Sequence, residues 1–168
     1  MTHPLVTQLR FARSEFQRGL EGVTAEEAVR RFLPMNCISW MVGHLAAQEH
    51  FYWVWMGHGE QVVSDELLGL VAYGQPASTP PLNEMWAMWH TVTTAADRFL
   101  DTITGEVLYV HMDRRGRPDY EDIGTRLLRN TYHYFFHLGE AQGIRQMLGH
   151  TGLPEFVGDM AAIIHSVE

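Results

Sequence analysis

Four long stretches of this chain repeat apolar side chains at the spacing of a helix, and they constrain its fold more than any other feature. They cover residues 4–22, 36–57, 81–104 and 125–149. The first is expected to turn one apolar face inward, made of Leu5, Leu9, Ala12, Phe16 and Leu20. Asn36 or Ser39 can cap the second, whose apolar stripe contains Trp40, His44, Ala47, Phe51 and Trp55. The segments between the four stretches allow the helices to alternate up and down, and no internal repeat occurs. The sequence therefore predicts an all-α protein, an up-down four-helix bundle, in which residues 1–168 form a single domain.

The connections between these helices predict short elements only. Thr24 and Glu27 have the spacing of a capping box, so we expect a short helix that continues to about Phe32. Other short helices are expected around residues 64–73 and in the tail. The helical period breaks near residues 105–122, where the chain predicts a small irregular or hairpin segment. Within it, residues 106–112 alternate well enough to be a short strand.

Composition narrows the classes of partner. The net charge is −8, and the 12 basic residues are scattered, so the sequence predicts neither nucleic acid nor an anionic membrane as a partner. No run of 18 apolar residues occurs that would span a membrane. The single cysteine, Cys37, excludes an internal disulfide and cysteine-rich zinc modules. Because the N-terminal residues do not resemble a signal peptide, a cytoplasmic protein is expected.

Histidine spacing gives the first indication of chemistry. His133 and His137 are four residues apart, but a chain with 10 histidines contains roughly 0.6 such pairs by chance. Their position adds weight, because both lie on the side of the last helix that a bundle would turn inward. His44 lies within an apolar stripe of the second long helix. Either the three are buried histidines bonded to a tyrosine or a carbonyl group, or they bind a metal ion.

The surrounding sequence favours a site with one metal ion. A carboxylate-bridged pair of irons needs Glu-x-x-His on two helices, and this motif does not occur; neither does His-Glu-x-x-His. Three imidazoles leave a coordination position open, as in catalytic sites, and they accept zinc, nickel, iron or copper. Glu140 follows His137 on the same face. It either accepts a hydrogen bond from an imidazole, carries protons, or forms an ion pair with an arginine.

Three segments resemble proteins of the DinB-like (DinB/YfiT) superfamily: LRFARSEFQRGLEGVTAEEA, NCISWMVGHLAAQEHFYW and YHYFFHLGEAQGIRQMLG. The resemblance implies a four-helix bundle with a divalent metal, most often zinc or nickel, held by His44, His133 and His137. It also implies a small-molecule substrate, a homodimer, and a low-molecular-weight thiol such as mycothiol, bacillithiol or glutathione.

Three functions follow as hypotheses. The leading one is a thiol S-transferase in which a metal-bound thiolate attacks an electrophile. The second is a metal-dependent hydrolase with Glu140 as the base. The third is a non-catalytic, stress-associated binding module, which the many aromatic side chains suggest. Three arginines, Arg114, Arg115 and Arg117, either steer an anionic substrate toward the site or belong to a solvated loop.

Overall fold

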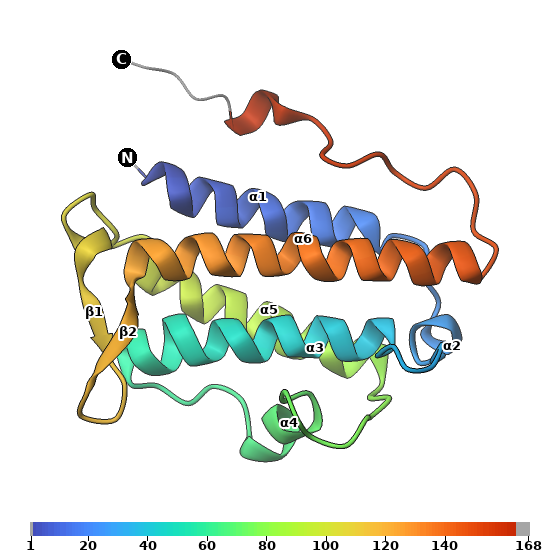
Figure 1. The fold of residues 1–168 in the computed structure, drawn as a ribbon, viewed down its shortest axis with the longest axis horizontal. Coiled ribbons are helices and arrows are strands. Elements are labelled where there is room, and N and C mark those ends of the chain that lie inside the picture. The colour runs from blue at the N-terminus through green and yellow to red at the C-terminus, as the bar shows by residue number, and fades with distance from the viewer. Residues whose placement is uncertain (1, 164–168) are drawn as a thin grey trace. The chain divides into compact units, whose positions relative to one another are not determined.

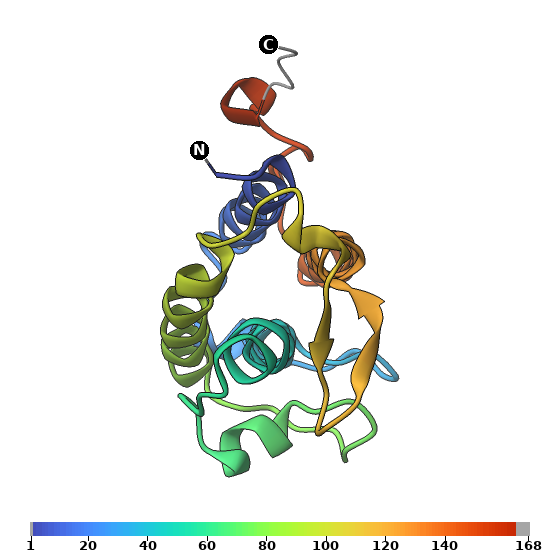
Figure 2. The ribbon, with the colours of Figure 1, turned by 90° about the vertical axis from the view of Figure 1, so that its left-hand side faces the viewer.

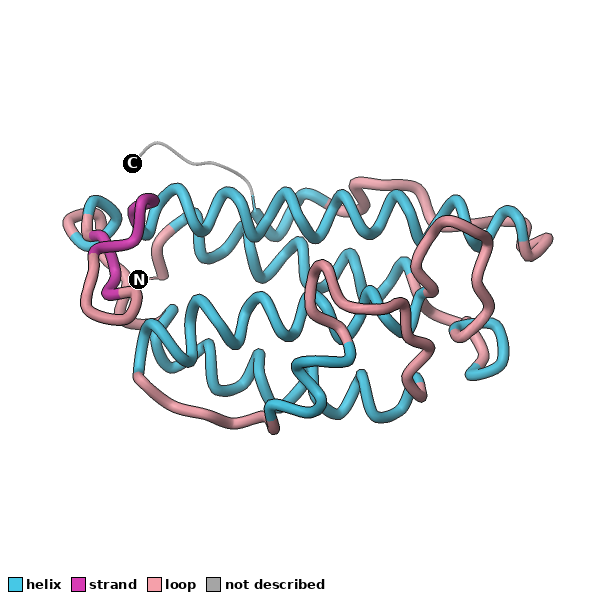
Figure 3. Tube along the Cα trace, turned by 60° about the horizontal axis from the view of Figure 1, so that its bottom comes forward, coloured by secondary structure: helices cyan, strands magenta, loops and turns pink. Residues whose placement is uncertain are grey.

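The computed structural model describes residues 2–163 and is predominantly helical (Figures 1 and 3). Within this range the strands form one two-stranded sheet. The chain divides into two compact units. The first unit contains the chain through Glu21, residues 103–111 and the chain from Tyr120 onward; the second contains residues 22–102 and 112–119. No helix among the described residues is long and apolar enough to cross a membrane.

The first unit is built on two helices, α1 (Pro4–Gly19) and α6 (Ile123–Met147), which lie side by side in Figures 1 and 2. Pro4 has no N–H to satisfy at the start of α1, and the Asp122 side chain caps α6 through the Thr125 N–H. Phe16 and Tyr134 are fully buried and meet edge to face, with 5.6 Å between their ring centres. This contact lies at the core of the helix pair.

The tail of the chain follows α1 within the same unit. The Gly158 N–H donates to the buried Glu15 carboxylate at 2.7 Å, and Arg18 bonds both that carboxylate and the Glu155 carbonyl group. A short 3₁₀ helix, η3 (Met160–Ile163), then ends the described chain. A second one, η2 (Val107–Tyr109), packs on α6.

The second unit is built on α3 (Ile38–Glu49) and α5 (Leu82–Leu100), which pack against each other. Helix α3 continues directly into a π-helical segment, η1 (His50–Met56). A short helix, α2 (Ala25–Ala28), precedes α3, and another, α4 (Asp65–Leu70), lies between η1 and α5.

Trp53 lies at the centre of this second unit. It is completely buried, and its ring stacks on Phe99 of α5 with 6.1 Å between ring centres. Tyr52 meets the edge of the same indole. This aromatic cluster fixes η1 against α5, so the residues on the opposite side of η1 keep a defined direction.

Gly43 marks the closest approach of α3 to its neighbours. A Cβ atom at this position would lie 2.8 Å from a methyl group of Val71 and would also overlap Met85. We expect Gly43→Ala to destabilise the protein by about 1–3 kcal/mol, because a β-branched side chain cannot easily move aside. Urea unfolding would measure this. Gly69→Ala is the matched control, since its Cβ meets no atom within 4 Å; equal losses in both variants would contradict the close packing.

A tight hairpin joins β1 (His111–Asp113) to β2 (Pro118–Asp122). The Arg114 N–H donates to the Arg117 carbonyl at 2.6 Å, and the two residues between them, Arg115 and Gly116, have φ angles of 58° and 80°. Positive φ at both central residues is typical of a type I′ turn, whose twist matches that of the strands. The structure thus confirms the small hairpin predicted near residues 105–122.

Most sequence predictions of secondary structure are confirmed, with three local corrections. The capping box of Thr24 and Glu27 is present, but its helix ends at Ala28 and does not reach Phe32. The strand predicted over residues 106–112 is a 3₁₀ turn followed by β1. Helix α3 begins after Cys37 without a side-chain cap, although Asn36 or Ser39 was expected to supply one. The predicted extra helices are present as α4 and η3; the four-helix bundle itself stays a prediction.

The apolar stripe predicted for the second long helix is also displaced. The predicted residues after Trp40 are His44, Ala47, Phe51 and Trp55, and all four are only half-buried. The fully buried side of α3 instead contains residues such as Met41 and Leu45. Almost all residues between the half-buried side and the fully buried side of the helix are apolar. Hydrophobic periodicity therefore does not distinguish the core side from the side next to it.

Candidate metal centre

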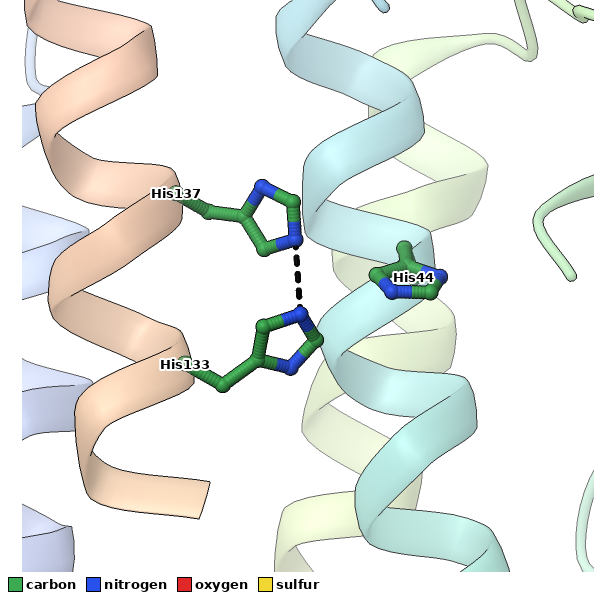
Figure 4. A group of neighbouring side chains, drawn as sticks. All are labelled: His44, His133 and His137. Carbon is green, nitrogen blue, oxygen red and sulfur yellow. Dashed lines mark hydrogen bonds between the residues drawn. The ribbon is translucent and has the colours of Figure 1, made fainter. Parts of the chain in front are cut away.

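Helix α6 holds two imidazoles in contact. His133 and His137 are one turn apart, and Figure 4 shows both rings projecting from the same side of the helix. Their Nε2 atoms lie 2.9 Å apart. His137 is 5% exposed and His133 is half-buried, so the pair is largely removed from water. Each ring therefore presents the same atom, Nε2, to one point in space.

Glu140 determines which ring nitrogen of His137 carries the proton. One oxygen of its carboxylate lies 2.6 Å from Nδ1 of His137, and the carboxylate side chain is 33% exposed. An ionised carboxylate only accepts hydrogen bonds, so Nδ1 carries the proton that it donates. In the neutral ring, Nε2 then holds a lone pair. This arrangement, with an imidazole oriented by a carboxylate, is typical of histidines that bind metals.

The short contact between the two rings has a direct consequence. With the lone pair of His137 on Nε2, the contact is a hydrogen bond only if Nε2 of His133 donates a proton. A divalent ion replaces such a proton, since metal ligands must be deprotonated. Metal–nitrogen bonds of about 2.0–2.1 Å can bridge two nitrogens at this separation. The pair thus fits two positions in the coordination shell of one ion.

In the second unit, a hydrogen bond at Nδ1 also fixes the tautomer of His44. Its Nδ1 lies 2.8 Å from the carbonyl oxygen of Val71, which can only accept, so Nδ1 donates. In the neutral ring this places the lone pair on Nε2. Trp40, one turn earlier on α3, stacks on the imidazole with 4.4 Å between ring centres and 12° between planes. Hydrogen bond and stacking together hold the ring in one orientation.

The candidate metal ligands among the described residues come from both units: His44 from the second, and His133 and His137 from the first. All are imidazoles, a donor set that suits zinc, nickel, iron and copper. Each of His44 and His137 has an oxygen acceptor that fixes its tautomer. The donor chemistry therefore fits the divalent ion that the sequence predicts.

Glu140 contacts His137 through its carboxylate, and among the described residues no arginine forms an ion pair with it. Its role, as an acceptor that orients the imidazole or as a proton carrier, stays a prediction. Sequence reasoning missed Val71 and the stacking role of Trp40. The carbonyl of Val71 carries no sequence signal, because every residue has one and this one is 27 positions from His44. Trp40 precedes His44 by four residues, and side chains at this spacing are neighbours on a helix, so the sequence could have indicated their contact.

The helical fold and the possible three-histidine site are those expected from the sequence resemblance to the DinB/YfiT-like superfamily. Comparison with family models makes the assignment specific: the model described as mycothiol-S-transferase matches residues 4–149. The chain belongs to the mycothiol-S-transferase family, which is part of the DinB/YfiT-like superfamily. This confirms the resemblance found in the sequence and indicates a thiol S-transferase. A comparison with curated proteins found no match.

Proposed function

We propose that this protein is a metal-dependent thiol S-transferase, in which His44, His133 and His137 hold one divalent ion, zinc or nickel. The observation that carries the proposal is the pair of Nε2 atoms on α6, 2.9 Å apart and backed by Glu140. When bound, the ion supplies a positive charge that lowers the pKa of a coordinated thiol, so that the thiol is deprotonated at neutral pH. Three protein ligands leave room for that sulfur.

The residues of the chain have separate tasks in this reaction. The carbonyl of Val71 and the carboxylate of Glu140 keep the two histidines that they contact in the tautomer with the lone pair on Nε2. During transfer, a sulfur–carbon bond forms, and the bond from that carbon to its leaving group breaks. The electron pair of the broken bond departs with the leaving group. Glu140 is partly exposed, so it can accept the thiol proton and pass it to water.

We propose mycothiol as the thiol, because the family model that covers residues 4–149 is described by that activity. The same resemblance supports a single domain folded as a four-helix bundle, working as a homodimer in the cytoplasm on a small-molecule substrate. Sedimentation velocity would test the dimer. A nucleic-acid role has no support in a chain of net charge −8.

The direct test is a transfer assay with tag-free protein. Protein loaded with zinc or nickel is mixed with mycothiol and monobromobimane, and formation of the thioether is followed by fluorescence. We expect turnover above the uncatalysed rate, dependent on both metal and mycothiol. Glutathione and bacillithiol in place of mycothiol would test the choice of thiol.

Other outcomes of this assay decide between the remaining hypotheses. Hydrolysis of a substrate without any thiol would favour the metal-dependent hydrolase. Metal binding with no turnover on any electrophile would favour the non-catalytic binding module.

Glu140→Ala tests the orienting role of the carboxylate. We expect the affinity for zinc to fall by about 10–100-fold, because the tautomer and direction of His137 are no longer fixed. Competition with a zinc-binding dye would measure the affinity. Glu106→Ala is the matched control, since this exposed glutamate lies outside the site and its side chain makes no cap bond. Equal affinities of the two variants would show that Glu140 is only a surface charge.

A further inference from the structure

The second unit contains a cavity of about 300 Å³ that the proposed metal ligands do not line. Its walls come from α3, η1, the segment around α4, and the hairpin turn, which contributes Arg115. This volume lies at the lower end of the range for small-molecule sites. The cavity thus suits a ligand with one or two rings.

One wall of the cavity is aromatic. Phe51 and Trp55 are one turn apart on η1, and their rings are nearly parallel, with 5.4 Å between centres and 10° between planes. Both are only half-buried, although the other side of η1 is fixed by the buried Trp53. Leu68 adds an apolar contact. A flat ligand can lie against such a surface with little loss of conformational freedom.

Arg115, which lines the cavity, has a costly backbone conformation. Its φ of 58° lies in the left-handed region, where a residue other than glycine costs about 1–2 kcal/mol and where asparagine is better tolerated. In this conformation its guanidinium lies over the ring of Trp55, at 5.7 Å from the centre, while Arg114 lies over Phe51 at 5.4 Å. A guanidinium stacked by its face keeps N–H groups along its edge, which can bind a carboxylate with two hydrogen bonds.

The cavity has three other polar lining residues, Gln61, Asp65 and His50. Asp65 accepts a hydrogen bond from Nε2 of Gln61 at 3.1 Å and has lone pairs for a further donor. His50 is buried, and its Nε2 accepts from the Val62 N–H at 3.2 Å. Burial lowers the pKa of His50, so it is neutral at pH 7. The charged groups that line the cavity are therefore Arg115 and Asp65.

The cavity adjoins His44 within the same unit. Ala47, one turn after His44 on α3, lines it, and so does Ala72. The residue before Ala72 is Val71, whose carbonyl accepts the hydrogen bond from His44. A ligand in the cavity is thus separated from this imidazole by about one helical turn.

We propose that this cavity binds the electrophilic co-substrate of the transferase: a small aromatic or conjugated molecule with a carboxylate for Arg115 and a hydroxyl or N–H group for Asp65. This inference rests on the proposed function, since it assigns the second reactant of that reaction. The mostly apolar walls and small volume match a flat acid. The thiol itself needs only the open position on the ion.

The test uses 6-hydroxy-2-naphthoate as a probe, with binding measured by isothermal titration calorimetry. We expect it to bind more tightly than 6-hydroxy-2-naphthamide by about tenfold, because the amide lacks the charge that pairs with Arg115. Arg115→Asn should weaken the acid by about tenfold and leave the amide unchanged, and asparagine suits the turn. Arg117→Asn is the matched control in the same hairpin and should change neither. Trp55→Leu should weaken both ligands.

Several results would overturn the inference. No binding of the acid, equal affinities for acid and amide, or an Arg115→Asn variant that binds like the original protein would each do so. Displacement of the probe by mycothiol would show that the cavity is the thiol site and not the co-substrate site.

A metal-site variant separates this inference from the proposed function. His133→Ala should lose zinc but still bind the probe, because no residue of α6 lines the cavity. Unchanged zinc binding in that variant, with normal probe binding, would contradict the metal proposal alone. If Arg115→Asn and Arg117→Asn both lost probe binding but kept zinc, the assignment of Arg115 would be contradicted and the metal proposal would stand.

Discussion

Replacing His137 with alanine is expected to remove metal binding almost completely. The substitution deletes one ligand and also leaves Glu140 without the imidazole that it orients. Loss of an orienting carboxylate alone costs about 10–100-fold in affinity, so loss of the ligand should exceed about 100-fold. Tag-free protein purified in the presence of zinc should contain about one ion per chain, and the His137→Ala protein almost none. Plasma mass spectrometry gives both ratios.

His90→Ala is the control for this experiment. His90 is exposed on α5 and does not belong to the three-histidine group, so its removal should leave the metal content unchanged. Circular dichroism should show the same helix content in both variants. A His137→Ala protein that binds one ion with the original affinity would contradict the proposed ligand set.

Trp53→Ala is expected to cause the largest loss of stability of any single substitution considered. Trp53 is completely buried, stacks on Phe99 and meets the edge of Tyr52, so its removal leaves a large cavity between η1 and α5. Truncation of a buried tryptophan costs about 3–5 kcal/mol. Since single domains are stable by about 5–15 kcal/mol, the variant should unfold at a much lower urea concentration.

Tyr73→Ala provides the aromatic control for that measurement. Tyr73 is 92% exposed, so its removal should change the free energy of unfolding by no more than about 0.5 kcal/mol. Similar small changes for Trp53 and Tyr73 would mean that Trp53 is not part of the core.

The sequence predicts the helices well where one face is apolar and the other polar. In α1, four of the five residues predicted to face inward are buried: Leu9, Ala12, Phe16 and Leu20. The remaining one, Leu5, is only half-buried, and its neighbour Val6 is buried instead. At a helix start, a shift of one residue changes the direction of a side chain by about 100°, so local packing decides between neighbours.

The sequence predicts less where the helix is apolar on nearly every side. In the segment from α3 through η1, periodicity selected the side that contains His44 and Trp55, which is half-buried. The π-helical turns of η1 also change the spacing of side chains, and they have no recognised sequence signal. This half-buried side carries the proposed metal ligand and the aromatic wall of the cavity.

The sequence indicates candidate ligands for the site but not the contacts that support them, and the ligand set itself stays a prediction. Histidine spacing and the family resemblance select His44, His133 and His137. Both signals rest on the identity of side chains, which the sequence gives directly. The hydrogen bond from His44 to the backbone of Val71, and the turn that brings Arg115 over Trp55, depend on the course of the chain. Such contacts join residues 27 and 60 positions apart, so no local pattern can reveal them.

X-ray absorption on zinc-loaded protein, with and without mycothiol, tests the central claim most directly. Without thiol, the spectrum should show about three imidazole nitrogens near 2.0–2.1 Å from the zinc, with oxygen from water completing the shell. Addition of mycothiol should introduce one sulfur at about 2.3 Å. A first shell without the scattering of imidazole rings, or one that mycothiol leaves unchanged, would contradict the account.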